Sequence, residues 1–455
     1  MQQSLPQSSK SPVMPFSEFL FALFRALDKE GVRYCILRNY EDFPISNIGR
    51  DIDFLIYPFD LPGVNRALHS IHGIRIVGYT ERHYVASFFL TGVSTSLQAQ
   101  ALQIDFDLSL TWKGLPYLPT DAVLNAMISR PAGNSTFFVP SPVHEAIISL
   151  LASLLVGGWL NEKYLARVSQ VFADNRNEVI ASLLPQFGLY TARQLVDSVI
   201  SGDYARIVSC VRSLRISLIL CNLFRRPLHS ALSIARHYGG ELTLRYSPKT
   251  LHAVSIFGAD FRGNTSVIST LMPLLNSMAV VVELHHISTT LSHEHQLWDT
   301  HSSLNCSNDA PRSWLASMAC VIILLVNTWV TQLMERRNLT LHIYDGCYQD
   351  LSINAKKYRY AGPMWLMQLL GVLFPSPYLW ILLDVPDNIS QSGCHKFLTT
   401  ETLRLRNSYR SFVKTRKRYI ILDAGRPSAI VAEDARDAII DALALCTAKQ
   451  LRDRF

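Results

Sequence analysis

Residues 254–266 read Val-Ser-Ile-Phe-Gly-Ala-Asp-Phe-Arg-Gly-Asn-Thr-Ser, and this stretch decides the fold expected for the second half of the chain. The apolar run 253–257 predicts a strand that ends at Gly258. Four residues then precede Gly263, where a helix is expected to begin. This spacing is that of the G-x-x-x-x-G-K-[ST] loop, in which backbone N–H groups and the helix N-terminus surround phosphate groups. We therefore expect an anion-binding turn between a strand and a helix.

The lysine of that motif is absent, because Asn264 occupies its position. Thr265 and Ser266 follow and keep the hydroxyl groups that the motif offers to Mg²⁺. Arg262, at the tip of the loop, could replace the missing charge, since a guanidinium group binds phosphate well. The alternatives are a turn that binds nucleotide without turnover and a turn that keeps only its fold.

Length and composition predict a globular protein of several domains. The 455 residues exceed what one hydrophobic core usually serves. Hydrophobic residues make up 49% of the chain and charged residues 17%, which is typical of compact proteins. The formal net charge of +7 is spread along the chain, and the dense basic run 414–418 is expected to be a solvated helix end. Nucleic acid is therefore not an expected partner.

The cysteine pattern and the first residues predict a cytoplasmic protein. Eight cysteines lack C-x-x-C spacing, which disfavours a zinc site or a disulfide framework. Residues 1–15 are rich in Ser, Gln and Pro without an apolar signal core, so we expect a disordered leader. The apolar stretch 314–334 is long enough to span a bilayer, but polar residues in its second half favour a buried helix. A membrane span is not expected, and the sequence allows a homodimer.

Three segments are expected after the leader, and together they predict an α/β protein. Residues 16–140 combine a helical pattern with short β-type runs, and residues 141–245 read as a helical connector. Residues 250–455 alternate strand-like runs with helical ones, which is typical of a parallel sheet covered by helices. These runs are 253–257, 279–284, 339–344, 379–384 and 419–423.

Three further motifs follow the loop in order. They are Tyr-Asp-Gly-Cys-Tyr-Gln-Asp at 344–350, Lys-Lys-Tyr-Arg-Tyr at 356–360 and Leu-Leu-Asp-Val-Pro at 382–386. With the loop, they resemble the thymidylate kinase family of P-loop phosphotransferases, and the resemblance covers residues 250–455. The chain looks especially like a bacterial branch in which this kinase module follows a nucleotidyltransferase-like domain.

The resemblance implies a kinase-like module that uses ATP and Mg²⁺ and transfers phosphate to a nucleotide or another small acceptor. Thr265 would bind Mg²⁺, and Asp345 would hold the metal shell or the acceptor hydroxyl. Arg359 would lie on the acceptor side. The implied residues are Asp345, Arg262 and Arg359 for catalysis, Tyr348 and Lys357 for the substrate, and Gly258, Asp260, Gly263, Asn264, Thr265 and Ser266 for ATP.

The chain departs from the family pattern at three positions. Asn264 replaces the loop lysine, Phe261 replaces a loop glycine, and Gly346 replaces the arginine that follows the motif aspartate. Removing one preorganised donor typically lowers a rate by ~10²–10³. We therefore expect the activity of this module to be reduced.

Paired carboxylates in the amino-terminal segment predict a metal site. Asp51 and Asp53 stand two residues apart in a strand-like run, so their side chains point the same way. Asp105 or Asp107, in Gln-Ile-Asp-Phe-Asp, is placed to add a third carboxylate from a neighbouring strand and complete a two-metal site. The arrangement resembles the nucleotidyltransferase superfamily, with Asp51 and Asp53 as the metal pair and Asp105 as the third acid. The resemblance extends through residues 112–118.

Three functions are compatible with these motifs. The first is phosphotransfer by the kinase-like module, and the second is nucleotidyl transfer at the amino-terminal acids, with the P-loop unit as a scaffold. The third is a non-catalytic protein that binds nucleotide or another protein. His285 and His286 follow the strand-like run 279–284 and could contact a ligand at the carboxyl edge of the sheet. Such a pair is also common in a purely structural role.

Overall fold

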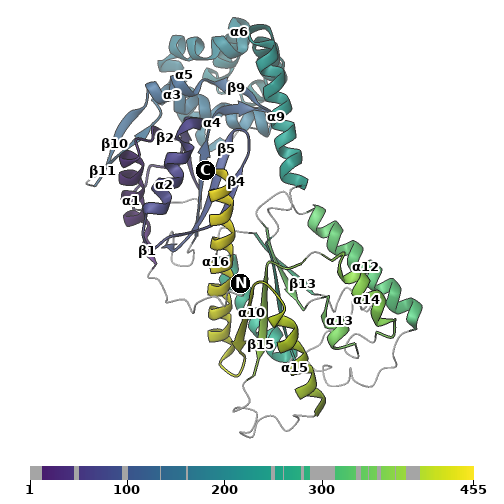
Figure 1. Cartoon of the computed structure of the whole chain (residues 1–455). Helices are drawn as coiled ribbons and strands as arrows, with labels where there is room; N and C mark the ends of the chain where they lie inside the picture. Colours follow the sequence, from purple (N-terminus) through teal and green to yellow (C-terminus); the bar gives the residue numbers. More distant parts are fainter. Residues whose placement is uncertain are drawn as a thin grey trace. The chain divides into compact units, whose positions relative to one another are not determined.

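The structure is a computed structural model, and it divides into two compact units (Figure 1). The amino-terminal unit contains Ser11–Leu244 and Thr447–Phe455, and the carboxyl-terminal unit contains Arg245–Cys446. Both combine helices with a sheet that includes parallel strands, which confirms the general α/β class. The described residues are 13–45, 51–94, 101–133, 135–159, 162–246, 252–259, 261–277, 281–286, 313–334, 340–346, 348–355, 360–374, 376–385 and 400–455.

The amino-terminal unit is built on a five-stranded sheet of order β2-β3-β7-β5-β4. Strands β3 and β7 are parallel, and every other neighbouring pair in this sheet is antiparallel. The strands are β2 (Tyr34–Ile36), β3 (Asp51–Ile56), β4 (Arg75–Glu81), β5 (Val85–Thr91) and β7 (Ala101–Asp107).

One face of this sheet forms a hydrophobic core with helices α1 (Phe16–Lys29) and α2 (Leu61–Ser70). Alternate residues of β3 and β7 point into it, because side chains in a strand alternate between faces. Phe54 of β3 stacks on Phe106 of β7, with ring centroids 5.0 Å apart. The remaining residues of these two strands therefore point to the opposite face.

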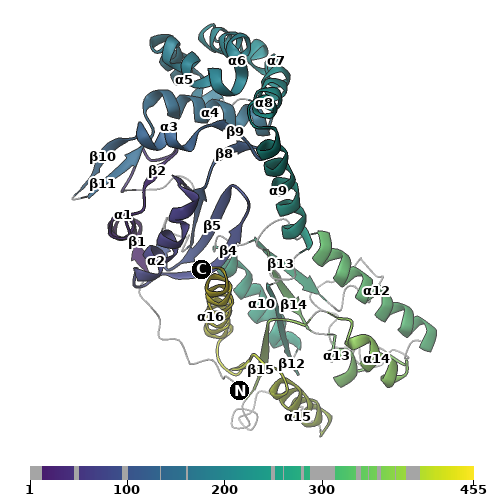
Figure 2. The same ribbon diagram turned by 45° about the horizontal axis from the view of Figure 1, so that its top comes forward.

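The opposite face packs against a layer of helices that covers most of the expected connector, 141–245. Leu55 of β3 shares a core with α4 (Pro142–Val156) and with the helices that follow it. Figure 2 shows α5 to α8 gathered in one group. These helices are α5 (Glu162–Asp174), α6 (Arg176–Ile200), α7 (Tyr204–Ser209), α8 (Val211–Arg225) and α9 (Pro227–Tyr246).

Within the described residues, one stretch, Tyr204–Arg225, is long and apolar enough to cross a membrane by length and composition. It comprises α7 and α8. Ile207, Leu214 and Leu218 on this stretch are fully buried in the same core as α4. Only one side of the stretch packs within the helical layer, because Ile216, Leu220 and Phe224 are exposed.

Shorter elements complete the amino-terminal unit. β1 pairs with β6, β8 with β9, and β10 with β11. They are β1 (Met14–Pro15), η1 (Pro58–Asp60), β6 (Val93–Ser94), β8 (Leu110–Trp112), β9 (Leu115–Leu118), α3 (Thr120–Asn125), β10 (Ile128–Ala132) and β11 (Ser135–Val139).

The carboxyl-terminal unit contains a five-stranded sheet of order β13-β14-β12-β15-β16, in which all neighbouring strands are parallel. Parallel strands need crossover connections, and the helices supply them. The strands are β12 (His252–Gly258), β13 (Val281–His286), β14 (Thr340–Asp345), β15 (Leu379–Asp384) and β16 (Tyr419–Asp423). The helices are α10 (Phe261–Asn276), α12 (Trp314–Met334), α13 (Asp350–Ile353), α14 (Met364–Gly371), α15 (Thr400–Lys414) and α16 (Ser428–Arg454).

Two of the hydrophobic clusters in this second unit lie wholly within the described residues. Helices α12, α13 and α14 share one cluster and lie together in Figure 1. The other forms between the sheet and α15, where Phe257 of β12 meets Trp380 of β15 and Tyr409 of α15. The apolar stretch 314–334 coincides with α12, which contributes Val321 to the first cluster. The expectation of a buried helix is wrong for much of its described length, because apolar side chains such as Trp314, Ile322 and Val326 are exposed.

The end of α16, from Thr447 onward, belongs to the amino-terminal unit, and its last turn is joined to β4 by an ion pair. Arg454 donates to both carboxylate oxygens of Glu81, at 2.6 and 2.8 Å, and the Tyr79 hydroxyl donates to the same carboxylate at 2.7 Å. Burial alone would raise the pKa of Glu81, but these donors outweigh it and the pKa is lowered. The pair therefore adds stability that is fully present above the ordinary carboxyl pKa of 4.5 and is lost as the pH falls through the lowered folded value.

We predict that Glu81→Gln lowers the free energy of unfolding at pH 7 by up to about 1 kcal/mol, since the Arg454 side chain is half exposed and solvent screens the pair. Urea unfolding at a series of pH values measures this difference from wild type. It should shrink as the pH falls below 4.5. Glu18→Gln, at an exposed position, is the control. A difference that stays constant or grows in acid would contradict the assignment.

Candidate functional site

Four aspartates lie on one face of the parallel pair β3–β7. In the strand register Asp53 is opposite Asp105, Asp51 is opposite Gln103, and Leu55 is opposite Asp107. Because side chains alternate along a strand, all four carboxylates point away from the Phe54–Phe106 core. The structure thus brings together the predicted metal ligands Asp51, Asp53 and Asp105, and also Asp107, the alternative third acid.

A pocket of about 410 Å³ opens on this face, between the sheet and α4. Asp53 and Asp107 line one side of it, and the apolar side chains of α4 and the exposed ring of Trp159 line another. Among the described lining residues, Arg38 is the basic one. The lining residues are Leu37, Arg38, Asn39, Asp53, Asp107, Leu110, Tyr117, Ile148, Ser149, Ala152, Ser153, Val156, Gly157 and Trp159.

The turn after β2 directs Arg38 toward the acids. The backbone N–H of Leu37 donates to the Asp53 carbonyl at 2.9 Å, which extends the pairing of β2 with β3. Asn39 then adopts a left-handed conformation, with φ of 59°, which asparagine tolerates better than most residues. Arg38 Nε donates to the Asp53 carboxylate, while 53% of the Arg38 side chain stays exposed. Arg38 can therefore also reach a ligand in the pocket.

The carboxylates of these aspartates repel one another, and burial limits their solvation. Burial raises the pKa of Asp107 well above its ordinary value, and the charges of Asp53 and Asp105 raise it further. Burial also raises the pKa of Asp105, although Gln103 Nε2 lies 3.0 Å from both of its carboxylate oxygens. A bound cation would relieve this repulsion, because it adds positive charge where the carboxylates concentrate negative charge.

Tyr117 lines the pocket and lies on β9, which a tight hairpin joins to β8. Lys113 and Gly114 connect β8 to β9 with φ of 51° and 83°, the positive values that a two-residue hairpin turn requires. A Cβ at Gly114 would lie 2.5 Å from the Ser233 carbonyl oxygen of α9, so glycine also permits close packing there. Tyr117 is buried, and burial together with Asp107 raises the pKa of its hydroxyl.

The oxygen-rich donor set fits a hard divalent cation. Carboxylates on adjacent strands are the ligands that Mg²⁺ uses when it also keeps waters and substrate phosphates. Two residues of this site were less evident from the sequence. Asp107 was an alternative to Asp105 and proves to line the pocket, and Trp159 gave no signal, because it reaches the pocket only through the packing of α4.

The predicted phosphate-binding turn joins β12 to α10. The side chain of Asn264, which occupies the lysine position of the motif, points into the protein. Asn264 is only 4% exposed, and its Nδ2 donates to the Gly258 carbonyl at 3.5 Å. Thr265 and Ser266 are exposed in the first turn of α10. Asp260 and the side chain of Arg262 lie outside the described residues.

Asp345 ends β14, next to β12, as expected for a residue at the carboxyl edge of a parallel sheet. Its carboxylate is 2.9 Å from Nδ1 of His286, on the neighbouring strand end, and this hydrogen bond raises the pKa of His286. His286 thus contacts a predicted site residue. His285 points to the other face of the sheet and contacts His342.

The other residues predicted to bind substrate either lie away from the carboxyl edge of the sheet or fall outside the residues that the structure describes. Tyr348 is buried among α12, α13 and α14, its hydroxyl donates to the Met367 carbonyl, and its ring stacks on Phe374. Lys357 and Arg359, predicted for substrate binding and catalysis, lie outside the described residues. Gly263 lies in the first turn of α10, which begins at Phe261 rather than at Gly263 as expected.

An aspartate that was not singled out as a site residue ends β15 at the same edge. Asp384 accepts hydrogen bonds from Arg406 Nε at 2.7 Å and from Arg410 Nε at 2.5 Å, both on α15. The sequence carried a signal for this cluster, because Arg406 and Arg410 are four residues apart and therefore share one face of a helix. Its partner in β15 is brought close only by the tertiary fold.

Comparison with known proteins adds no identification. A scan against protein-family models finds no match, and a search of curated proteins finds no matching sequence.

The close approach at Gly258 yields a prediction about the P-loop-like turn. A Cβ there would lie 2.4 Å from the Leu383 carbonyl oxygen and 2.8 Å from Oδ1 of Asn264, so β12 and β15 would have to separate. Gly258→Ala should lower the free energy of unfolding of the carboxyl-terminal unit by about 1–3 kcal/mol. Chemical denaturation measures the loss.

The matched control is Gly240→Ala in α9, where a Cβ meets nothing within 4 Å and alanine favours the helix. Equal stability of Gly258→Ala and wild type would show that the turn is looser than the structure indicates.

Proposed function

We propose that the amino-terminal unit is a nucleotidyltransferase-like enzyme that depends on a divalent metal. The observation that carries this proposal is the placement of Asp51, Asp53, Asp105 and Asp107 on one face of two parallel strands beside a pocket of about 410 Å³. A pocket of this size is in the range of small-ligand sites. The carboxylates provide the oxygen ligands that nucleotide-bound Mg²⁺ requires.

The proposed reaction transfers a nucleoside monophosphate to a hydroxyl group. The acceptor oxygen attacks the α-phosphorus of a nucleoside triphosphate, the bond from that phosphorus to the bridging oxygen breaks, and pyrophosphate leaves. The hydroxyl proton passes to a carboxylate of the cluster or to water. When bound, Mg²⁺ neutralises phosphate charge and activates the attacking oxygen.

The chain's own residues have distinct parts in this proposal. Asp51, Asp53 and Asp105 hold the cation at the edge of the pocket. Arg38 exchanges its bond with Asp53 for one with a phosphate oxygen, which its half-exposed side chain allows. Trp159, a residue that is 54% exposed, offers a flat apolar wall for a base or another planar group.

Replacement of the central acid tests this function. Asp53→Asn should reduce metal-dependent pyrophosphate release from nucleoside triphosphates by about 10²–10³-fold, as loss of one preorganised charge typically does. The assay uses the full chain with Mg²⁺ or Mn²⁺, each of the four triphosphates, and a panel of sugars and nucleoside monophosphates as acceptors. Titration with Mn²⁺ alone should also show weaker binding.

Asp174→Asn, on the exposed side of α5, is the control and should leave both readouts unchanged. Asp105→Asn should lose activity without losing stability, because it removes a carboxylate whose pKa is raised by burial. Unchanged pyrophosphate release in Asp53→Asn, or a wild-type chain that binds no Mn²⁺, would refute the proposal.

The carboxyl-terminal unit is the basis of a second candidate function, a phosphotransferase similar to thymidylate kinase. Its support is the turn from Gly258 into α10 beside the end of β14, where Asp345 lies. ATP and Mg²⁺ would be the cofactors, with Thr265 at the metal. The inward amide of Asn264 leaves the phosphates without the lysine that usually contacts them.

Asn264→Lys tests that candidate. If the rest of the turn is intact, the lysine will extend toward the phosphates, and the variant will bind Mg-ATP more tightly than wild type and phosphorylate a nucleoside monophosphate. Calorimetry with Mg-ATP and Mg-dTMP, followed by a kinase assay, measures both steps. No heat from either nucleotide in wild type and variant would favour a scaffold or an interaction protein instead.

A further inference from the structure

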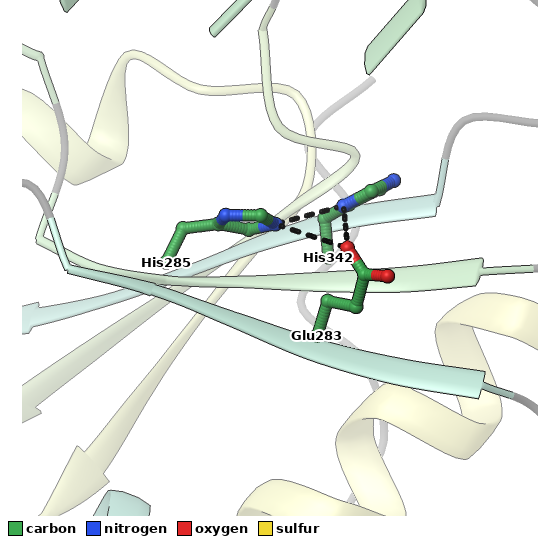
Figure 3. A group of neighbouring side chains, drawn as sticks. All are labelled: Glu283, His285 and His342. Atoms are coloured by element: carbon green, nitrogen blue, oxygen red, sulfur yellow. Dashed lines mark hydrogen bonds and ion pairs between the residues drawn. The ribbon is translucent and has the colours of Figure 1, made fainter. Parts of the chain in front are cut away.

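A second cluster of metal-ligand side chains lies on one face of β13 and β14 in the carboxyl-terminal unit. Glu283 and His285 are two residues apart on β13 and so share a face, and His342 is opposite Glu283 in the register with β14. Figure 3 shows the two imidazole rings and the carboxylate turned toward one another from the two strands. The cluster lies outside both candidate sites described above.

The three ligand atoms have the mutual spacing of a metal's coordination shell. His285 Nε2 is 3.0 Å from His342 Nδ1, and Glu283 Oε2 is 3.8 Å from the first nitrogen and 3.9 Å from the second. All three lie within 4.8 Å of one another. Metal–nitrogen bonds of about 2.0–2.1 Å in a tetrahedron place ligand atoms roughly 3.4 Å apart. The observed distances bracket that value, so small side-chain rotations suffice for all three atoms to bind one ion.

We propose that Glu283, His285 and His342 bind a transition-metal ion, Zn²⁺ in the first instance, with water as its fourth ligand. Two imidazole nitrogens and one carboxylate are a donor set that suits Zn²⁺ better than Mg²⁺. The site therefore differs in chemistry from the all-oxygen cluster of the amino-terminal unit.

The surroundings of the cluster favour a bound ion. The His342 side chain is only 3% exposed, His285 is 24% exposed and Glu283 34% exposed, so the ligands are shielded while the carboxylate can still reach solvent. The His285 imidazole lies beside that of His342, with ring centroids 5.2 Å apart. The ring also stacks on Tyr344, with centroids 5.1 Å apart, and this contact limits its rotation.

The ion would act as a cross-link in the sheet. As described, β13 is an edge strand that pairs with β14, and its residues are only partly buried. Ligands from both strands would join this edge to the interior of the sheet. Metal binding would then stabilise the folded unit, because the unfolded chain does not hold the three groups together.

Calorimetric titration of the chelator-treated full chain with Zn²⁺ tests the proposal. Wild type should bind one ion at this site, and Glu283→Gln and His285→Gln should each weaken binding by at least about 10–100-fold, since even the loss of a supporting second-shell partner has that effect. Both substitutions preserve or nearly preserve side-chain volume. Circular dichroism checks that the variants remain folded.

His286→Gln is the matched control, because His286 is the next residue on β13, points to the other face and contacts Asp345. It should bind Zn²⁺ at the cluster as wild type does. Zn²⁺ should also raise the melting temperature of wild type and of His286→Gln but not that of Glu283→Gln. Equal Zn²⁺ affinity in wild type, Glu283→Gln and His285→Gln would overturn the proposal, as would a loss confined to His286→Gln.

Discussion

The alternation of side chains along β3 and β7 is the constraint on which the rest of the amino-terminal unit depends. Phe54 and Phe106 stack in the core on one face, and this fixes Asp53 and Asp105 side by side on the other. A slip of one residue in the register would turn the acids into this core and the phenylalanines toward the opposite face. The same packing that stabilises the sheet therefore holds the carboxylates together against their repulsion, which the ion pair with Arg38 only partly offsets.

The carboxyl-terminal unit brings polar groups together in a similar way. Its strands are all parallel, so their carboxyl ends lie at the same edge of the sheet. There, however, intramolecular partners already hold the main groups. Asp345 contacts His286, Asp384 accepts from two arginines, and Asn264 donates to the loop's own backbone. In the amino-terminal unit Asp53 is likewise paired with Arg38, and Asp105 contacts Gln103, but Asp53 and Asp107 also line a pocket of about 410 Å³. This pocket beside the acids is why the proposed catalysis is assigned to the amino-terminal unit.

Local patterns were enough to predict the five strands of the carboxyl-terminal sheet, and the placement of Asp51 beside Asp53 followed from the two-residue period of a strand. The runs 379–384 and 419–423 coincide with β15 and β16. The packing of segments that are distant in the sequence could not be predicted from these local patterns. No local signal shows that the segment 141–245 packs on the acid-bearing face and so brings Trp159 to the pocket. The same holds for the meeting of Glu283 with His342, because pairing of distant strands depends on the order of the whole sheet.

The central claim is that the face of β3 and β7 binds a divalent cation through oxygen ligands. Crystals of the full chain soaked in Mn²⁺ and a non-hydrolysable nucleoside triphosphate test it directly, through anomalous diffraction from the bound ion. The account predicts an anomalous peak within bonding distance of the Asp53 and Asp105 carboxylates, with the triphosphate in the adjacent pocket. A nucleotide bound elsewhere, with no peak between these two carboxylates, would contradict it.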